Sequence, residues 1–177
     1  MPGASPGVAS SSACASRAFC IPENAVRQSP RFERVLLFLA IALMESFGIH
    51  VQITTDPEYE SVEGFVVAPT QQAIIANWVR GDGMWHVDVT GRATAVRQYT
   101  EVAGDVAAHS IIQGLSPTVR LQALAHYLEL DWSWLTRRCA ALSQHGSTRL
   151  VRTRSRLVSP AGLDAACAFV GSLSNEH

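Results

Sequence analysis

Apolar and polar positions along the chain change period several times, and each change predicts a different element. The first strong signal is residues 31–47, RFERVLLFLAIALMESF, which are apolar on almost every side of a helix. Ser29-Pro30 is a start signal for this helix, and Gly48 is a stop signal. Its apolar run over residues 35–44 is too short to cross a bilayer, which needs about 20 residues. We therefore expect a buried, central helix.

Four short segments rich in β-branched and aromatic residues follow this helix, and turn signals separate them. They cover residues 50–55, 62–69, 72–79 and 84–90. The glycines of the RGDG sequence at residues 80–83 suit a hairpin loop between the last two segments, so the sequence predicts an antiparallel sheet. Helical spacing returns over residues 94–112 and ends near Gly114. Residues 31–113 are thus predicted to form a small α+β unit.

Residues 117–146 predict a pair of helices joined by a short turn. Ser116-Pro117 begins the first helix, and residues 129–131 form the turn. Asp131 is placed to cap the second helix, because its carboxylate can accept hydrogen bonds from the free amides of the first turn. An inward apolar stripe recurs on the second helix at intervals of three and four residues, made by Trp132, Leu135, Cys139 and Leu142.

The opposite side of this second helix carries side chains of the kind that read DNA. Small residues near its start permit close approach, and arginine and glutamine can pair with purine edges in the major groove. A solvated helix face can have the same composition, so the face alone does not separate DNA reading from an ordinary surface helix. The candidate base-reading residues are Ser133, Thr136, Arg137 and Gln144.

A basic stretch follows the helix pair. Residues 147–160, STRLVRTRSRLVSP, predict two short strands around Thr153 to Ser155, and residues 161–173 predict a closing helix. The stretch holds several arginines and no acidic residue, which favours an anionic partner over a plain charged hairpin. Together with Arg138, the candidate phosphate contacts are Arg149, Arg152, Arg154 and Arg156.

The order helix, turn, helix, hairpin, helix over residues 117–172 resembles a winged helix-turn-helix. It is most similar to the C-terminal DNA-binding module of bacterial regulators of the catabolite activator type. Glu129 departs from that family where glycine is usual in the turn, and Arg138 departs where an apolar residue is usual, so we expect Arg138 to lie along Trp134. The preceding unit lacks the glycine-rich phosphate loop of the family's cyclic-nucleotide domain. The family's buried positions are matched by Leu124, Ala125, Leu128, Leu130 and Leu135.

Composition adds a local bias to this picture. The net charge is −1, from 14 basic and 15 acidic residues. All the basic residues are arginine, and residues 117–177 hold seven of them against four acids, so positive charge gathers in the C-terminal third. The cysteines lack zinc-ligand spacing and predict no metal site, while Cys139 and Cys167 are predicted to be small core residues. Residues 1–30 are rich in Ser, Ala, Pro and Gly and predict a disordered tail without a secretory signal.

The predicted sheet holds the remaining candidate chemistry. His86 and Asp88 alternate onto one strand face, but no ExxH, HExxH or GxSxG motif accompanies them. Catalysis is therefore the weakest of the hypotheses. A candidate small-molecule pocket is formed by Phe65, Trp78, Trp85 and His86.

The sequence as a whole predicts an α+β protein with a tail over residues 1–30, a sensing or dimerisation domain over 31–113 and a winged helix-turn-helix domain over 117–172. The leading hypothesis is a cytoplasmic bacterial transcription regulator, not an enzyme, that binds duplex DNA as a homodimer, needs no cofactor and responds to a small-molecule effector. The competing hypothesis is a protein-interaction or assembly module that uses the same helix pair. A third is a small-molecule-binding enzyme centred on His86 and Asp88.

Overall fold

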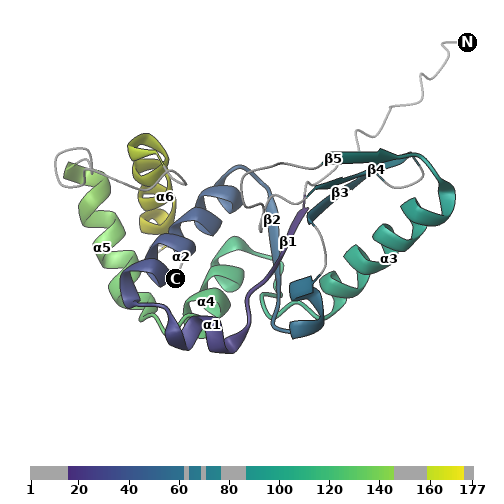
Figure 1. Cartoon of the computed structure of the whole chain (residues 1–177). Helices are drawn as coiled ribbons and strands as arrows, with labels where there is room; N and C mark the ends of the chain where they lie inside the picture. The colour runs from purple at the N-terminus through teal and green to yellow at the C-terminus, as the bar shows by residue number, and fades with distance from the viewer. Residues whose placement is uncertain (1–15, 62–63, 69–70, 77–86, 146–158, 174–177) are drawn as a thin grey trace, which may run out of the picture.

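The computed structural model describes residues 16–61, 64–68, 71–76, 87–145 and 159–173. Its elements lie in three neighbouring groups: a helical bundle, a pair of strands beside it, and a sheet with its own helix (Figure 1). The fold is α+β, as predicted. The bundle contains α1 (Glu23–Gln28), α2 (Arg31–Ser46), α4 (Pro117–Tyr127), α5 (Trp132–His145) and α6 (Pro160–Ser172). The remaining elements are β1 (Ser16–Cys20), β2 (His50–Thr54), the 3-10 helix η1 (Pro57–Ser61), β3 (Gly64–Ala68), β4 (Gln72–Ala76), β5 (Val87–Thr90) and α3 (Ala93–Ala108).

The helix α2 begins and ends where the sequence predicts. Pro30 precedes its first turn, and Gly48 follows its last turn with a left-handed φ of 73°. The amide of Gly48 donates to the carbonyl of Glu45, and the amide of Ile49 donates to that of Met44, which together form a Schellman motif. Glycine suits this position because it has no Cβ to strain the backbone at positive φ.

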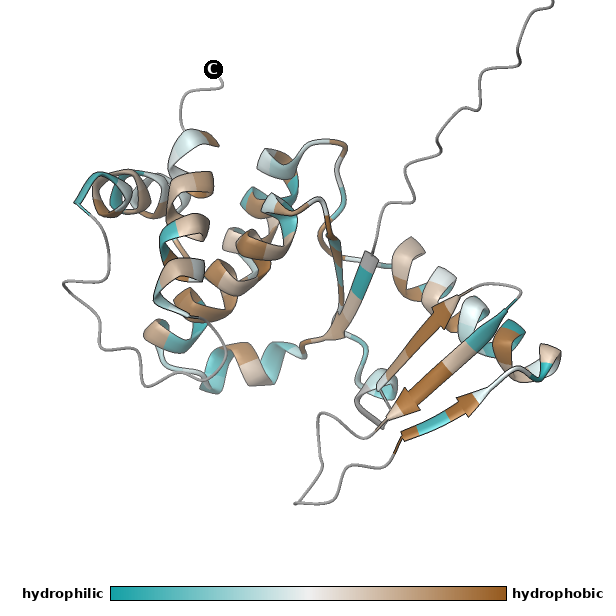
Figure 2. Cartoon of the chain, turned by 90° about the horizontal axis from the view of Figure 1, so that it is seen from above, coloured by the Kyte–Doolittle hydropathy of each residue, from teal (hydrophilic) through white to brown (hydrophobic). Residues whose placement is uncertain are grey.

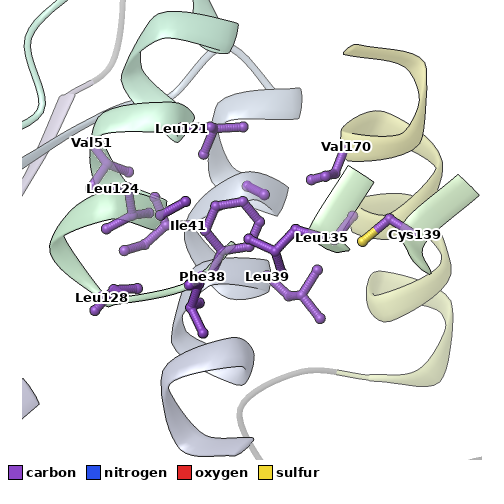
Figure 3. Close-up of a cluster of buried hydrophobic side chains, with 14 of the residues drawn as sticks. Phe38, Leu39, Ile41, Val51, Leu121, Leu124, Leu128, Leu135, Cys139 and Val170 are labelled. Carbon is purple, nitrogen blue, oxygen red and sulfur yellow. The ribbon is translucent and has the colours of Figure 1, made fainter. Parts of the chain in front are cut away.

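The hydrophobic core lies inside the helical bundle, with α2 at its centre (Figure 3). Phe38, Ile41 and Ala42 of α2 are at most 1% exposed. This helix packs on α6, α4 and β2, so it is buried and central, as predicted. Among the helices of the described segments, none is both long enough and apolar enough to span a bilayer. The hydrophobic core also contains side chains from the other elements: Val51 and Ile53 of β2, Leu121 and Leu124 of α4, Leu135 of α5, and Cys167 and Val170 of α6.

The position of α2 bears on the predicted division of the chain. The sequence placed this helix in a unit over residues 31–113, apart from a second domain over residues 117–172. In the structure, side chains from both ranges share one hydrophobic core. The buried side chains of the sheet and α3 form a separate set: Ala73, Ile75, Ala76, Val96 and Val106.

Residues 16–30 form a strand and a helix, which corrects the prediction that they belong to a disordered tail. β1 pairs with β2 in parallel along its whole length. The amide of Ile21 then donates to the carbonyl of Thr54, and the hydroxyl of Tyr127 donates to the carbonyl of Ile21 at 2.5 Å. Composition gave the wrong answer here because these bonds join the segment to distant parts of the chain. Residues 1–15 lie outside the described residues.

The sheet is antiparallel, as predicted, with the strand order β3-β4-β5, and α3 lies along one side of it (Figure 2). Phe65 of β3 contacts Tyr99 of α3, with ring centroids 4.8 Å apart. Val96 and Val106 of α3 are also buried. β2 is a strand, as predicted, but it pairs with β1 and is not part of this sheet.

The helix α3 ends at Ala108, before the predicted end at residue 112. The chain then runs beside β2, where the amide of Ile111 donates to the carbonyl of Ile53 at 2.8 Å. The amide of Ile53 in turn donates to the hydroxyl of Ser110 at 3.0 Å. Ile112, the last residue of the predicted helix, is instead buried in the core of the bundle. The helix was predicted too long because the position of Ile112 fits a helical apolar spacing. The residue is buried whether it continues the helix or, as observed, lies in the segment after it.

A buried ion pair links α2, α4 and β2. The side chains of Arg120 and Glu45 are 7% and 1% exposed, and their nearest nitrogen and oxygen atoms are 2.5 Å apart. Arg120 also donates to the carbonyl of Gly114 at 2.9 Å, and Glu45 accepts from the amide of Val51 at 3.0 Å. Both charges therefore have several hydrogen-bond partners, which buried charges need. The local sequence carries no sign of this pair, because the two residues lie 75 positions apart.

Candidate nucleic-acid interface

The turn between α4 and α5 is short and contains a residue with a left-handed backbone. Glu129 adopts a φ of 53°, in the left-handed region. The amide of Glu129 donates to the carbonyl of His126 at 3.0 Å, and the amide of Leu130 donates to that of Ala125 at 2.8 Å. These two bonds form a Schellman motif at the end of α4. A positive φ favours glycine, so Glu129, with its Cβ, is strained at this position.

Two acidic side chains at this turn make structural contacts. The carboxylate of Asp131 accepts from the amide of Trp134 at 2.5 Å, which confirms its predicted role as the cap of α5. The carboxylate of Glu129 accepts from the guanidinium of Arg34 in α2 at 2.6 Å. Arg34 also donates to the carbonyl of Leu128 at 3.0 Å. The turn is thereby attached to α2, and a cation lies against the charge of Glu129.

One face of α5 is buried and the other is open. The predicted inward stripe is confirmed, since Leu135 and Cys139 are 1% and 4% exposed. Trp132 and Leu142 are partly buried against the same core. Of the four predicted base-reading residues, the structure leaves three exposed: Ser133, Arg137 and Gln144.

Thr136 does not lie on the open face, which corrects its place in the predicted set. Thr136 is only 5% exposed. Its hydroxyl donates to the backbone carbonyls of Trp132 and Ser133, at 3.1 and 3.2 Å. Thr136 lies about one turn after Trp132 and hence at the edge of the inward stripe. A hydroxyl bonded back to its own helix can be buried, so polarity alone was a poor guide at this residue.

An aromatic ring and a cation from two different helices meet beside the open face. The residue Trp134 is 37% exposed, and its ring lies under the guanidinium of Arg31 in α2, 4.6 Å from carbon to centroid. The sequence predicted that Arg138 would lie along this ring, whereas the observed cation over it comes from α2. Arg138 is exposed on α5. Sequence reasoning missed Arg31 because the residue belongs to a helix far away in the chain.

The other side of α5 is packed closely on α6. A Cβ added at Gly171 would come within 2.9 Å of the Cα of Ala140, so glycine permits the two helices to approach here. Cys139 and Cys167, the buried thiol pair, lie at the same interface. The hydrogen bond to Cys167 and burial both raise the pKa of Cys139. Their burial confirms that both cysteines are core residues, as predicted.

The predicted wing lies outside the described residues, and so do its phosphate-contacting arginines, Arg149, Arg152, Arg154 and Arg156. The closing helix is confirmed as α6, which Ser159 caps by accepting from the amide of Gly162 at 3.0 Å. Three described arginines surround the open face: Arg31, Arg137 and Arg138. Within the segments that the structure describes, none of these three forms an ion pair with an acidic side chain.

The predicted small-molecule pocket is only partly described, because Trp78, Trp85 and His86 fall outside the described residues. Phe65 is half-buried against Tyr99. Nearby is an open hollow of about 380 Å³, where β4 and β5 meet α3. It includes the exposed Asp88 but not Phe65, and its lining residues are Ile75, Asp88, Val89, Thr90, Arg92, Ala95 and Tyr99.

Comparisons with family models, with curated proteins and with solved structures found no match for this chain.

Proposed function

We propose that this chain is a DNA-binding transcription regulator in which α4 and α5 act as a helix-turn-helix and α5 enters the major groove. The observation that carries the proposal is the open face of α5, which presents Arg137 and Arg138 while the opposite face is buried. A major groove about 12 Å wide admits a helix. The left-handed turn at Glu129 and the cap at Asp131 fix where α5 begins, which sets the direction of each outward side chain.

Position along α5 gives its exposed residues different roles. Ser133 and Arg137 lie one turn apart near the start of the helix, the end that contacts base edges in helix-turn-helix proteins. Arg137 has the forked geometry that pairs with guanine, a contact that contributes about 1–3 kcal/mol of discrimination. Gln144 lies about 16 Å further along the axis than Ser133, so it reaches only the far end of a site. Arg138, about 100° round the helix from Arg137, contacts a phosphate.

Assembly and regulation belong to the same proposal. The arginines of the basic stretch act as a phosphate-contacting wing. Two copies of the chain bind a two-fold site in the cytoplasm, with half-sites about 34 Å apart, which is one turn of DNA. The unit of β3, β4, β5 and α3 is the sensing part, and the hollow beside Tyr99 is its candidate effector site.

Selection of bound fragments from randomised duplex DNA tests this function. The wild-type protein should enrich a sequence motif, and Arg137→Ala should lose preference at part of that motif by about 1–3 kcal/mol per base pair. Arg97→Ala is the matched control, because it removes an exposed arginine from α3, outside the bundle. If the wild-type protein enriches no motif and shows no salt-sensitive duplex binding, the proposal is wrong.

A protein partner for the same helix pair is the second candidate function, and exposed aromatic residues favour it. Trp134 of α5 is 37% exposed, and Phe32 near the start of α2 is 64% exposed. Tryptophan and arginine dominate the binding energy of many protein interfaces. Salt dependence helps to separate the two functions, because DNA affinity falls with a log-log slope of about 0.9 per phosphate neutralised.

A further inference from the structure

The start of α2 places an additional cation at the open face of α5. Arg31 is the first residue of α2, and its guanidinium carbon lies 4.6 Å from the ring centroid of Trp134. The residue is exposed, and no acidic side chain in the described segments pairs with it. A positive charge from outside the helix-turn-helix is therefore held beside the helix proposed to read DNA.

Stacking on Trp134 leaves the hydrogen-bonding edge of Arg31 available. A guanidinium contacts an indole through its flat face, whereas its five N–H donors lie in its plane. A stacked side chain has already lost part of its rotamer freedom, so a new contact orders it less than it would order a free surface arginine. The same planar fork matches the oxygens of a phosphate. The pair has the chemistry of a preorganised phosphate contact.

Helical geometry puts this cation on one flank of α5. Successive residues are about 100° apart, so Trp134 and Arg138 form a row beside the row of Ser133 and Arg137. Arg31 lies over the first member of the flanking row, and Arg138 follows one turn later. The two cations therefore run alongside the proposed base-reading row, where the phosphates bordering a groove would lie.

The acidic residues near this flank do not oppose a phosphate there. Glu129 is held by Arg34 at 2.6 Å, and the carboxylate of Asp131 accepts from the backbone at the start of α5. Glu33 is exposed two residues after Arg31, which puts it about 200° round α2, on the other side of that helix. Both carboxylates remain charged, but Arg31, Arg34 and Arg138 outnumber them, so the net charge of the flank is positive.

We infer that Arg31, held by Trp134, binds a backbone phosphate of duplex DNA, so that α2 is part of the DNA interface. The inference rests on the proposed function, which supplies the DNA. It extends the contact surface to a residue outside the 117–172 range that resembles a winged helix-turn-helix. It also gives the exposed Trp134 ring a role in positioning a cation.

Duplex binding by the full chain, followed by fluorescence anisotropy across a range of salt concentrations, tests this contact. The probe is the fragment most enriched by the wild-type protein. Arg31→Ala should reduce the log-log salt slope by about 0.9, and its affinity deficit should be about 3.5-fold larger at 50 mM than at 200 mM salt. The enriched motif should stay the same, because a phosphate contact carries no direct sequence information.

Arg27→Ala is the matched control, because it removes an exposed arginine of α1 that is paired with Glu23 at 2.9 Å. Its salt slope should equal that of the wild type. Trp134→Leu keeps the charge of Arg31 but removes the ring, and it should show part of the affinity loss of Arg31→Ala. Circular dichroism checks that each variant is folded.

The outcomes separate the inference from the function on which it rests. If the wild-type protein binds duplex DNA and Arg31→Ala keeps the slope of Arg27→Ala, the phosphate contact is wrong and the proposed function stands. If Trp134→Leu binds like the wild type, the ring does not position the cation. If the wild-type protein does not bind duplex DNA, the proposed function fails, and this inference fails with it.

Discussion

Removal of one partner from the buried ion pair of Arg120 and Glu45 should destabilise the whole bundle. The side chains of Arg120 and Glu45 are 7% and 1% exposed. Arg120→Met therefore leaves the buried carboxylate without a counter-charge, and Glu45→Gln leaves the buried guanidinium without one. Each change should lower the free energy of unfolding by about 3–5 kcal/mol. Glu45→Leu should cost about 1–3 kcal/mol more than Glu45→Gln, because the buried amide of Val51 also loses its acceptor. The free energy of unfolding of a typical domain is only about 5–15 kcal/mol, so each of these losses is a large part of it.

The double variant distinguishes a coupled pair from two independent residues. Glu45→Gln combined with Arg120→Met leaves no buried charge, so its loss should be smaller than the sum of the single losses by at least about 2 kcal/mol. Urea unfolding followed by circular dichroism gives each free energy, and the slope m checks that the transition is comparable between variants. Arg27→Met is the surface control and should change the free energy by less than about 1 kcal/mol.

Two results would refute this account of the ion pair. Losses below about 1 kcal/mol for both single variants are those of a surface pair, and would mean that water compensates each remaining charge. A double variant that loses the full sum would mean that Arg120 and Glu45 contribute independently.

Other contacts in the bundle give three further predictions, of which the first two concern the free energy of unfolding measured in the same way. Glu129→Val should lower the free energy of unfolding by about 1–3 kcal/mol, because a β-branched residue is strained at positive φ. Glu129→Gly should be tolerated, and equal stability of the two variants would contradict the turn geometry. Gly171→Ala should cost about 1–3 kcal/mol, since its Cβ would meet the backbone of Ala140, while a loss no larger than that of the exposed Ser172→Ala would rule out the close approach. The buried thiol pair should react with iodoacetamide only after unfolding, and mass spectrometry showing equally fast labelling of the native protein would contradict its burial.

Features that depend on nearby residues were predictable from the sequence. Gly48 ends α2, and Asp131 caps α5, because each acts on backbone groups within a few residues. Helical spacing selected the inward stripe of α5 for the same reason. It also assigned Ser133, Arg137 and Gln144 correctly to the exposed side, although their DNA contacts remain a prediction.

Contacts between distant segments could not be read from the chain. The pairing of β1 with β2, and the stacking of Arg31 on Trp134, each join residues whose local sequences carry no sign of the other. The sequence shows the residue types of each segment, but tertiary packing decides which other segment each one contacts. Thr136 shows the same limit within one helix, because its polarity suggested exposure while its hydroxyl bonds to the helix backbone.

The chain leaves the bundle after β2 and returns beside the same strand. Ile53 bonds to Ile111 and Ser110, so the two ends of the segment that holds β3, β4, β5 and α3 lie next to each other. That segment has the connectivity of an inserted domain, and insertions are tolerated where their ends are close. Engineering can therefore exchange the insert separately from the host bundle. β2 contacts both parts, because it packs on α2 of the bundle and on α3 of the insert.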